Sequence, residues 1–120
     1  MNTANGADEL IQAGELLIRP AQYTAVARGM VMVLSRREFQ LLVVLSRAPG
    51  RVIPREELYA EVWGGEMEKR DRSVDVYVHK LRSKLADALP DWRFIHTHFG
   101  FGYRFHPERS QLLSNSATTQ

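Results

Sequence analysis

The stretch that decides the fold is residues 71–85, which read DRSVDVYVHKLRSKL. At 100° per residue, an α-helix gathers its apolar side chains within about 40° of Val74, with Tyr77 beside them. The gathered residues are Val74, Val78, Leu81, Leu85 and Ala88. The opposite side carries Arg72, Val76, His79, Lys80 and Ser83. We therefore predict an amphipathic helix, capped by Asp71 and ending near Leu89, with one face in a core and the other in solvent.

The solvent face of this helix suits the major groove of DNA. The groove admits one α-helix, and a lysine such as Lys80 can donate to guanine O6 and N7. A small apolar group such as Val76 can meet a thymine methyl group. Arg82 and Lys84 lie to the sides, where they are placed for phosphates. Cations on a solvated helix are also ordinary, so this helix alone leaves the two interpretations open.

The rest of the chain is divided by clear start and stop signals. Four short β-type runs come first, at residues 11–14, 15–19, 23–28 and 30–34. The capping box 35–38 then opens a first helix, which ends at Ala48-Pro49-Gly50. After a short extended link at 52–53, Pro54 opens a second helix at its first helical position, and Gly64-Gly65 ends it. With the third helix and a terminal hairpin, this order predicts an α+β winged helix-turn-helix.

The hairpin is predicted from residues 94–99 and 103–106, joined by Gly100-Phe101-Gly102. By alternation we expect Phe99, Tyr103 and Phe105 to pack inward. Phe101 is out of that phase, so we expect it to be exposed at the turn. The hairpin would form a wing beside the third helix, with His98 and Arg104 reaching the DNA backbone or minor groove.

Composition excludes several classes of protein. The chain has 120 residues, of which 44% are apolar and 25% charged, which fits one globular domain. It has no cysteine, so disulfides, cysteine-based zinc sites and thiol catalysis are excluded. We expect no membrane span, because the longest apolar runs are far shorter than the about 20 residues needed. The absence of cysteine is compatible with a reducing cytoplasm, which is the location that we expect.

The charge is distributed unevenly along the chain. The net charge is only +2, yet residues 69–84 hold six basic and two acidic residues, a local charge of +4. The other residues therefore sum to −2. This basic segment contains the predicted third helix, which favours a polyanionic partner for that helix. We predict a linker or disordered tail at 1–13, a DNA-binding domain at 14–106 and a disordered tail at 107–120.

Four motifs resemble one known family. Residues 71–85 are similar to the recognition helix of the OmpR/PhoB-type response-regulator DNA-binding domain, and Gly100–Phe105 (GFGYRF) is similar to its wing. Ser35–Leu42 matches the opening of its first helix. Glu57-Leu58 with Val62-Trp63-Gly64 matches its second helix. The resemblance covers about residues 14–106, in the family's order.

The resemblance implies a winged helix with an N-terminal four-stranded antiparallel sheet, three helices and a hairpin wing. It implies double-stranded DNA as partner, bound as a tandem dimer on direct repeats, in a two-component phosphorelay with a receiver domain and a sensor kinase upstream. By position, it implies a base contact at Lys80, with Asp75 and Val76 nearby, and phosphate contacts at Arg72, Tyr77, His79 and Arg82. With the residues taken from the helix face and the wing, the candidate DNA-binding residues are Arg72, Ser73, Asp75, Val76, Tyr77, His79, Lys80, Arg82, Ser83, Lys84, His98 and Arg104. The implied RNA polymerase contact is the loop of Gly65, Glu66, Met67, Glu68, Lys69 and Arg70.

The sequence departs from the family pattern at three points. The wing usually carries an Arg where Phe99 stands, and that Arg often enters the minor groove. The second helix usually opens with Ser or Thr rather than Pro54. No receiver domain fits before residue 14, so the chain is either the effector part of a longer regulator or a stand-alone member. The polar segment 1–13 resembles an interdomain linker and favours the first.

Two other classes of function remain as alternatives. His96 and His98, with His106 opposite, have a spacing that zinc can use, but no carboxylate accompanies them at a fixed motif distance. We therefore predict no catalysis, no metal and no cofactor. The second alternative is a winged helix used only for protein contacts, for example with RNA polymerase. The acidic residues around the second helix would serve it; they are Glu56, Glu57, Glu61, Glu66 and Glu68.

Overall fold

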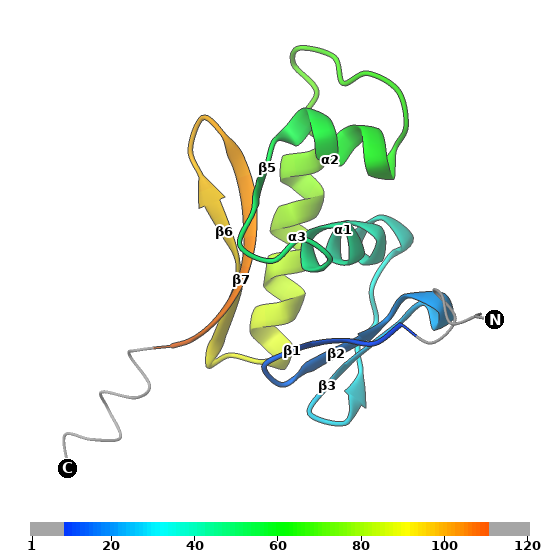
Figure 1. Ribbon diagram of the computed structural model, residues 1–120, viewed down its shortest axis with the longest axis vertical. Helices are drawn as coiled ribbons and strands as arrows, with labels where there is room; N and C mark the ends of the chain where they lie inside the picture. The colour runs from blue at the N-terminus through cyan, green and yellow to red at the C-terminus, as the bar shows by residue number, and fades with distance from the viewer. Residues whose placement is uncertain (1–8, 111–120) are drawn as a thin grey trace.

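A computed structural model describes residues 9–110 of the chain, and Figure 1 shows its arrangement. In chain order the elements are β1 (Ile11–Ala13), β2 (Leu16–Arg19), the 3-10 turn η2 (Pro20–Gln22), β3 (Thr24–Ala27), β4 (Met30–Val31), α1 (Arg36–Ser46), β5 (Val52–Ile53), α2 (Arg55–Val62), α3 (Ser73–Ala88), β6 (Trp92–His98) and β7 (Gly102–Arg109). The predicted winged helix-turn-helix is confirmed.

The elements extend past both predicted domain boundaries. Strand β1 begins at Ile11, within the segment predicted as a linker, because its three residues pair with β2. Strand β7 continues to Arg109, past the predicted end at residue 106, because its last residues pair with the start of β6. The predictions for residues 1–8 and 111–120 lie outside the described residues.

The first four strands form one antiparallel sheet in the order β1-β2-β3-β4, as expected. Alternation gives the sheet one buried face, with Leu16 and Ile18 of β2 beside Ala25 and Ala27 of β3. Strand β4 is shorter than its apolar run predicts, and Val33 lies beyond it with 86% exposure. This sheet lies at one end of the molecule, below α1 in Figure 1.

A second sheet contains the wing. Its order is β5-β7-β6, so the extended link at Val52-Ile53 is a strand of the wing sheet, which the sequence did not indicate. Gly102 makes this pairing possible. A Cβ atom there would overlap the carbonyl oxygen of Ile53 and lie 2.7 Å from its carbonyl carbon. Only glycine therefore allows β5 to approach the base of the wing turn.

Helix α3 stands between the wing and α1, as Figure 1 shows, and packs against α1 and β6. Its predicted core stripe is confirmed at Val74, Val78, Leu81 and Leu85, which are buried. Ala88, the fifth predicted member, is half-buried against the core. Helix α1 begins with the predicted capping box: Glu38 N donates to Ser35 Oγ at 3.2 Å, and Ser35 N donates to Glu38 Oε1 at 2.8 Å. The side of α3 opposite its buried stripe therefore faces away from the core.

Two predicted helix starts need correction. Pro54 is the N-cap of α2 rather than its first helical residue, because its ψ of 151° is extended. The N-cap of α3 is Arg72 and not Asp71. Asp71 still satisfies the first turn from one position earlier, where Oδ1 accepts from Ser73 N at 2.8 Å.

A cluster of charged side chains joins the N-terminal sheet to the base of the wing. Arg28 donates to Glu15 Oε1 at 2.7 Å and to Asp91 Oδ1 at 2.6 Å, while Arg109 lies 3.1 Å from Asp91. Trp92 Nε1 also donates to Glu15 at 2.8 Å. The hydrogen bonds from Arg28 and then Trp92 lower the pKa of Glu15 to about 2. This cluster sets the wing at a fixed place relative to the first sheet.

Candidate nucleic-acid interface

One face of α3 presents polar and cationic side chains to solvent. Arg72 heads the helix with its side chain 80% exposed, and Val76 one turn later is 45% exposed. His79, Lys80 and Ser83 continue the face and are also exposed. The structure thus places these five predicted site residues together. We call this set the α3 face.

Lys80 has a distinct environment on that face. Its Nζ lies 4.9 Å from the centroid of the Tyr77 ring, which supports the extended side chain by a cation–π contact. Tyr77 in turn packs edge-on against Trp63 of the α2 terminus, with ring centroids 5.6 Å apart. Tyr77 therefore borders both the core and the α3 face, as its flanking position on the helical wheel predicts.

Asp75 is held inside the protein surface by three partners. Arg55 Nε donates to Asp75 Oδ1 at 2.7 Å, and the Tyr103 hydroxyl donates to the same oxygen. Arg72 lies 3.9 Å from the other oxygen. Burial acts to raise the pKa of Asp75, but the bonds from Tyr103 and Arg55 outweigh it and lower that pKa. We call Asp75, Arg55 and Tyr103 the Asp75 cluster; it ties α3 to α2 and to the wing.

Arg82 makes a second connection between α3 and the wing. Its Nη1 donates to Thr97 Oγ1 at 2.7 Å and to the carbonyl of Ile95 at 3.4 Å. The guanidinium groups of Arg82 and Arg55 each lie 5.8 Å from the centroid of the Tyr103 ring. Burial, followed by the bond to Asp75, raises the pKa of Tyr103 to about 12, so the hydroxyl stays a proton donor at neutral pH.

Lys84 is also engaged within the protein. Its Nζ lies 2.8 Å from Oε1 of Glu38, whose side chain is only 3% exposed. Burial opposes ionisation of Glu38, but the bonds from Lys84 and from Ser35 lower its pKa. Glu38 thus serves the α1 capping box and anchors α3 at once. Lys84, predicted to contact phosphate, already has a buried partner.

The wing presents a different chemistry at its turn. Arg104 Nε donates to His98 Nε2 at 2.9 Å, so the two predicted wing residues are in contact with each other. Tyr103 and Phe105 are buried, as predicted. The prediction that Phe99 packs with them is wrong, because Phe99 is 85% exposed. Strand β6 ends at His98, so Phe99 belongs to the turn, where the alternation of a strand no longer applies.

The loop between α2 and α3 projects from the top of the molecule in Figure 1. Its exposed members are Gly65, Glu66, Glu68, Lys69 and Arg70. Met67 is half-buried against the core and anchors the loop. Of the acidic residues near α2, Glu57 is paired with Arg51 at 2.7 Å. Glu56 and Glu61 are exposed on the helix itself.

The histidines of the wing do not converge on one point. His96 is buried, and its Nε2 lies 2.9 Å from the carbonyl oxygen of His106. Burial lowers the pKa of His96, because it disfavours the charged form of the ring. Among residues 9–110, no group of three or more His, Cys, Asp or Glu side chains is arranged to hold a metal ion. Within the same range, no helix is long and apolar enough to cross a membrane.

Sequence reasoning missed the partners that join elements. Arg55 and Thr97 carry no motif, and only the folded arrangement brings them to Asp75 and Arg82. The one available signal was the combination of an acidic residue on a basic helix face with a Tyr in the wing.

The chain matches a described family and solved structures. The family "Transcriptional regulatory protein, C terminal" matches residues 29–105. The transcriptional regulatory protein CreB of Escherichia coli is 43% identical over 72 residues, which is 60% of this chain and 31% of CreB. The heme response regulator HssR of Staphylococcus epidermidis is 34% identical over 98 residues, which is 82% of this chain and 43% of HssR.

Two crystal structures show the same fold. The DNA-binding domain of CpxR from Escherichia coli has a TM-score of 0.75 at 30% identity, covering 82% of this chain and 96% of that one. The RstA DNA-binding domain of Klebsiella pneumoniae, in complex with the RstA box, has a TM-score of 0.74 at 32% identity. It covers 82% of this chain and 97% of that one. From its fold, its α3 face and these matches, the chain belongs to the OmpR/PhoB-type family of transcriptional regulatory C-terminal domains.

Proposed function

We propose that this domain binds double-stranded DNA sequence-specifically and regulates transcription, with α3 in the major groove and the wing on the adjacent backbone or minor groove. The observation that carries the proposal is the α3 face, where Arg72, Lys80 and His79 stand exposed on the side of α3 away from the core. A related domain, that of RstA, was crystallised with its DNA box. That relationship supports the same partner here.

The free residues of α3 would make the base contacts. Lys80 would donate to guanine, while Val76, His79 and Ser83 line the rest of the groove surface. Arg72, at the helix N-terminus, would meet a phosphate, as would Tyr77 through its hydroxyl and Ser73 at the first turn. On the wing, His98 and Arg104 would contact the backbone beside the minor groove.

The engaged residues have a different role in this proposal. Asp75, Arg82 and Lys84 each hold α3 against a neighbouring element. Asp75 would act as a positioning residue, since its two oxygens already have cationic or hydroxyl partners. Arg82 keeps further N–H groups for a phosphate while it fixes the wing. Lys84 would add positive charge at the edge of the groove.

The chain spans about a third to two fifths of the length of the curated relatives that it matches. We propose that it is the effector part of a two-component regulator, with a receiver domain phosphorylated by a sensor kinase. Paired domains would bind direct repeats in tandem. The projecting loop 65–70 would contact RNA polymerase, and all of these encounters would take place in the cytoplasm.

The experiment is selection of this domain on a random duplex pool at about 0.15 M salt, a physiological ionic strength. We expect direct repeats with a spacing of about one helical turn, 10–10.5 bp. Enrichment of no motif, with binding that disappears as salt rises, would mean backbone binding alone. If the domain retained no duplex even at low salt, the proposed DNA binding would be wrong.

A protein-interaction module is the second candidate, and the projecting loop 65–70 favours it. Both functions can coexist on one domain, because this loop lies outside the α3 face. Retention of RNA polymerase by a domain that retains no DNA at low salt would give this candidate precedence. Loss of that retention on Lys69→Glu with Arg70→Glu would assign it to the loop.

A further inference from the structure

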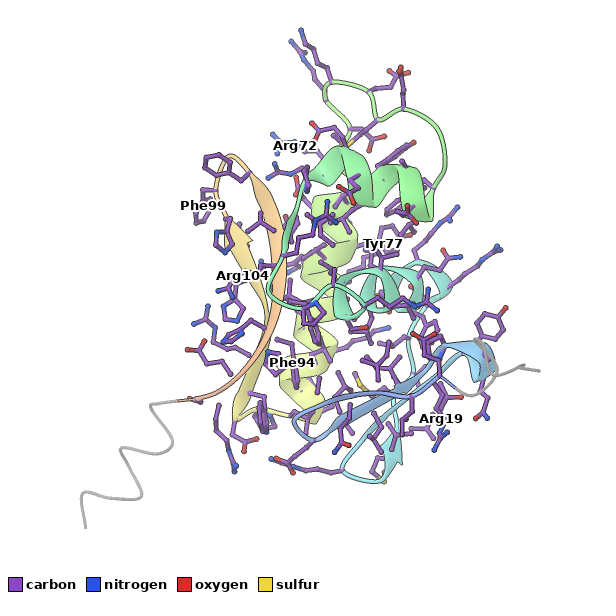
Figure 2. All side chains as sticks on the ribbon, viewed as in Figure 1. Arg19, Arg72, Tyr77, Phe94, Phe99 and Arg104 are labelled. Atoms are coloured by element: carbon purple, nitrogen blue, oxygen red, sulfur yellow. The ribbon has the colours of Figure 1, made fainter. Side chains whose placement is uncertain are left out.

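The wing turn carries two solvent-exposed phenyl rings. Phe99 is 85% exposed and Phe101 is 73% exposed, and Figure 2 shows Phe99 at the extremity of the hairpin. Phe101 N donates to the carbonyl of His98 at 2.8 Å, and Gly100 between the rings has a φ of +83°. This tight turn projects the two rings outward. We call Phe99, Gly100 and Phe101 the wing tip.

The strand that follows the wing tip contacts the first turn of α3. Gly102 follows the wing tip directly, and the next residue, Tyr103, donates to Asp75 on α3. Asp75 is in turn 3.9 Å from Arg72 at the head of the helix. Figure 2 shows Arg72 and Phe99 toward the same end of the molecule. A duplex seated on the α3 face therefore passes within reach of the wing tip.

The cations near the wing fit a polyanion. Arg104 lies on the strand that follows the wing tip, where it donates to His98, and Arg82 reaches the wing at Thr97. Arg72 lies at the head of α3, toward the same end of the molecule (Figure 2). The carboxylate of Asp75 is paired with Arg55 and so does not oppose an anion there. Two exposed phenyl rings on a wing that also carries Arg104 and contacts Arg82 match a nucleic acid, which offers phosphates outside and stacked aromatic bases within.

We propose that the wing tip acts as an aromatic wedge: the Phe99 ring enters the minor groove, stacks on a partly unstacked base step and bends the duplex. The inference rests on the proposed DNA binding. Apolar side chains inserted between base steps bend DNA by about 20–90°. Pyrimidine–purine steps open most easily, so the wedge selects such a step at the wing position. Phe101 packs along the groove wall beside it.

The test uses the duplex selected by the parent domain, with 2-aminopurine at the wing-facing step and a fluorophore on each end. We expect the parent to raise 2-aminopurine fluorescence and to shorten the end-to-end distance. Phe99→Ala should abolish both changes and weaken binding about tenfold, the scale of one base–aromatic stack. Phe101→Ala should weaken binding less and keep the bend.

Two variants sharpen the result. Tyr23→Ala removes another exposed aromatic side chain, 82% exposed between the 3-10 turn η2 and β3, and should change neither signal. Phe99→Arg should restore affinity without the bend, because an arginine fits a narrow minor groove without opening a step. The slope of log K against log salt should also become steeper by about one unit for this variant. The Phe99 and Phe101 variants should unfold at the parent's temperature, since these two rings are exposed.

The outcomes separate the wedge from the function on which it rests. Parent binding with unchanged fluorescence, or with the same signals in Phe99→Ala, overturns the wedge and leaves DNA binding intact. Loss of self-association in Phe99→Ala, with the bend retained, assigns the wing tip to a second copy of the chain and also overturns the wedge. Failure of the parent to bind any duplex overturns both proposals.

Discussion

The α3 face begins toward the end of the molecule that carries the wing tip (Figure 2), and the two surfaces present opposite chemistry. The α3 face is polar and cationic, with Arg72 and Lys80 exposed, whereas the wing tip exposes Phe99 and Phe101. The helix face is held by a regular element with a buried stripe behind it. The wing tip depends on a single turn and on the glycine that follows it. The two surfaces are therefore suited to different contacts: the α3 face to hydrogen bonds with base edges, as proposed for the major groove, and the wing tip to the apolar contact proposed for the minor groove.

The largest expected effect comes from a substitution that disrupts the wing sheet and leaves every residue of α3 unchanged. Gly102→Ala would force a Cβ atom into the carbonyl group of Ile53, so β5 and β7 would have to separate. We expect the free energy of unfolding to fall by about 3 kcal/mol or more, the range of severe backbone conflict. Urea denaturation measures this loss.

Gly100→Ala is the matched control for that change. Nothing lies within 4 Å of a Cβ atom at Gly100, whose φ is +83°, so only local strain is added. We expect a cost of about 1 kcal/mol. Equal losses in the two variants would show that turn strain, rather than the approach of β5, governs the wing.

The second prediction concerns the ion pair between Lys84 and Glu38, which anchors α3 to α1. Lys84→Met leaves the buried Glu38 with Ser35 as its donor, so we expect a loss of about 1–2 kcal/mol in the free energy of unfolding at pH 7. Lys80→Met, four residues earlier on the exposed face, should change it by less than about 0.5 kcal/mol. Thermal and urea unfolding compare the two. Equal losses would mean that the Lys84–Glu38 pair contributes nothing specific.

The same pair gives a dependence on pH. The pKa of Glu38 lies lower in the folded protein than in the unfolded chain, where its usual value is 4.5. Its contribution is therefore present above pH 4.5 and is lost as the pH falls through the folded value. The stability difference between the parent and Lys84→Met should shrink over that window. A constant difference from pH 7 to pH 3 would exclude the pair as its source.

The third prediction distinguishes positioning from base contact. Asp75→Asn and Tyr103→Phe should each loosen the wing against α3, with a cost of about 1 kcal/mol in unfolding free energy. Both variants should weaken the sequence preference at the base pairs that face the wing. The preference at the base pair that faces Lys80 should stay unchanged. Selection on random duplexes measures this for each variant. If only Asp75→Asn changed the base preference, and did so at a base pair facing α3, Asp75 would contact a base directly rather than position the wing.

The smallest expected effect concerns Arg72, the exposed cation at the N-terminal end of the α3 face. Arg72→Ala should weaken binding to all sequences alike and lower the slope of log K against log salt by about one unit. Filter binding across a salt series gives that slope. A change in sequence preference with an unchanged slope would place Arg72 on a base and not on a phosphate.

The helical part of the molecule could be predicted from the sequence because helical periodicity is local. The core stripe from Val74 to Leu85 and the α1 capping box follow from spacing along one segment. The pairing of Val52-Ile53 with the wing could not be predicted, since two residues carry too little pattern to indicate a partner strand. Phe99 was misassigned because alternation says nothing of where a strand ends.

The sequence predicted which residues form the site, but not which of them are exposed to a ligand and which are bonded within the protein. The helical wheel identified which residues leave the core, and it placed Lys80 and Val76 correctly on the α3 face. It could not show that Asp75 and Lys84 are engaged, because Arg55 and Glu38 come from other helices. Such partners depend on packing between elements, which one sequence does not display.

The most direct measurement is duplex selection by Lys80→Ala beside Lys69→Ala. Both changes remove one exposed lysine, but Lys80 lies on α3 and Lys69 in the loop before it. We expect Lys80→Ala to lose preference at one base pair, at a cost of about 1–3 kcal/mol if that lysine contacts a guanine through two acceptors. Lys69→Ala should enrich the parent's motif. Recovery of the parent's motif and affinity by Lys80→Ala would contradict the assignment of the α3 face to the major groove.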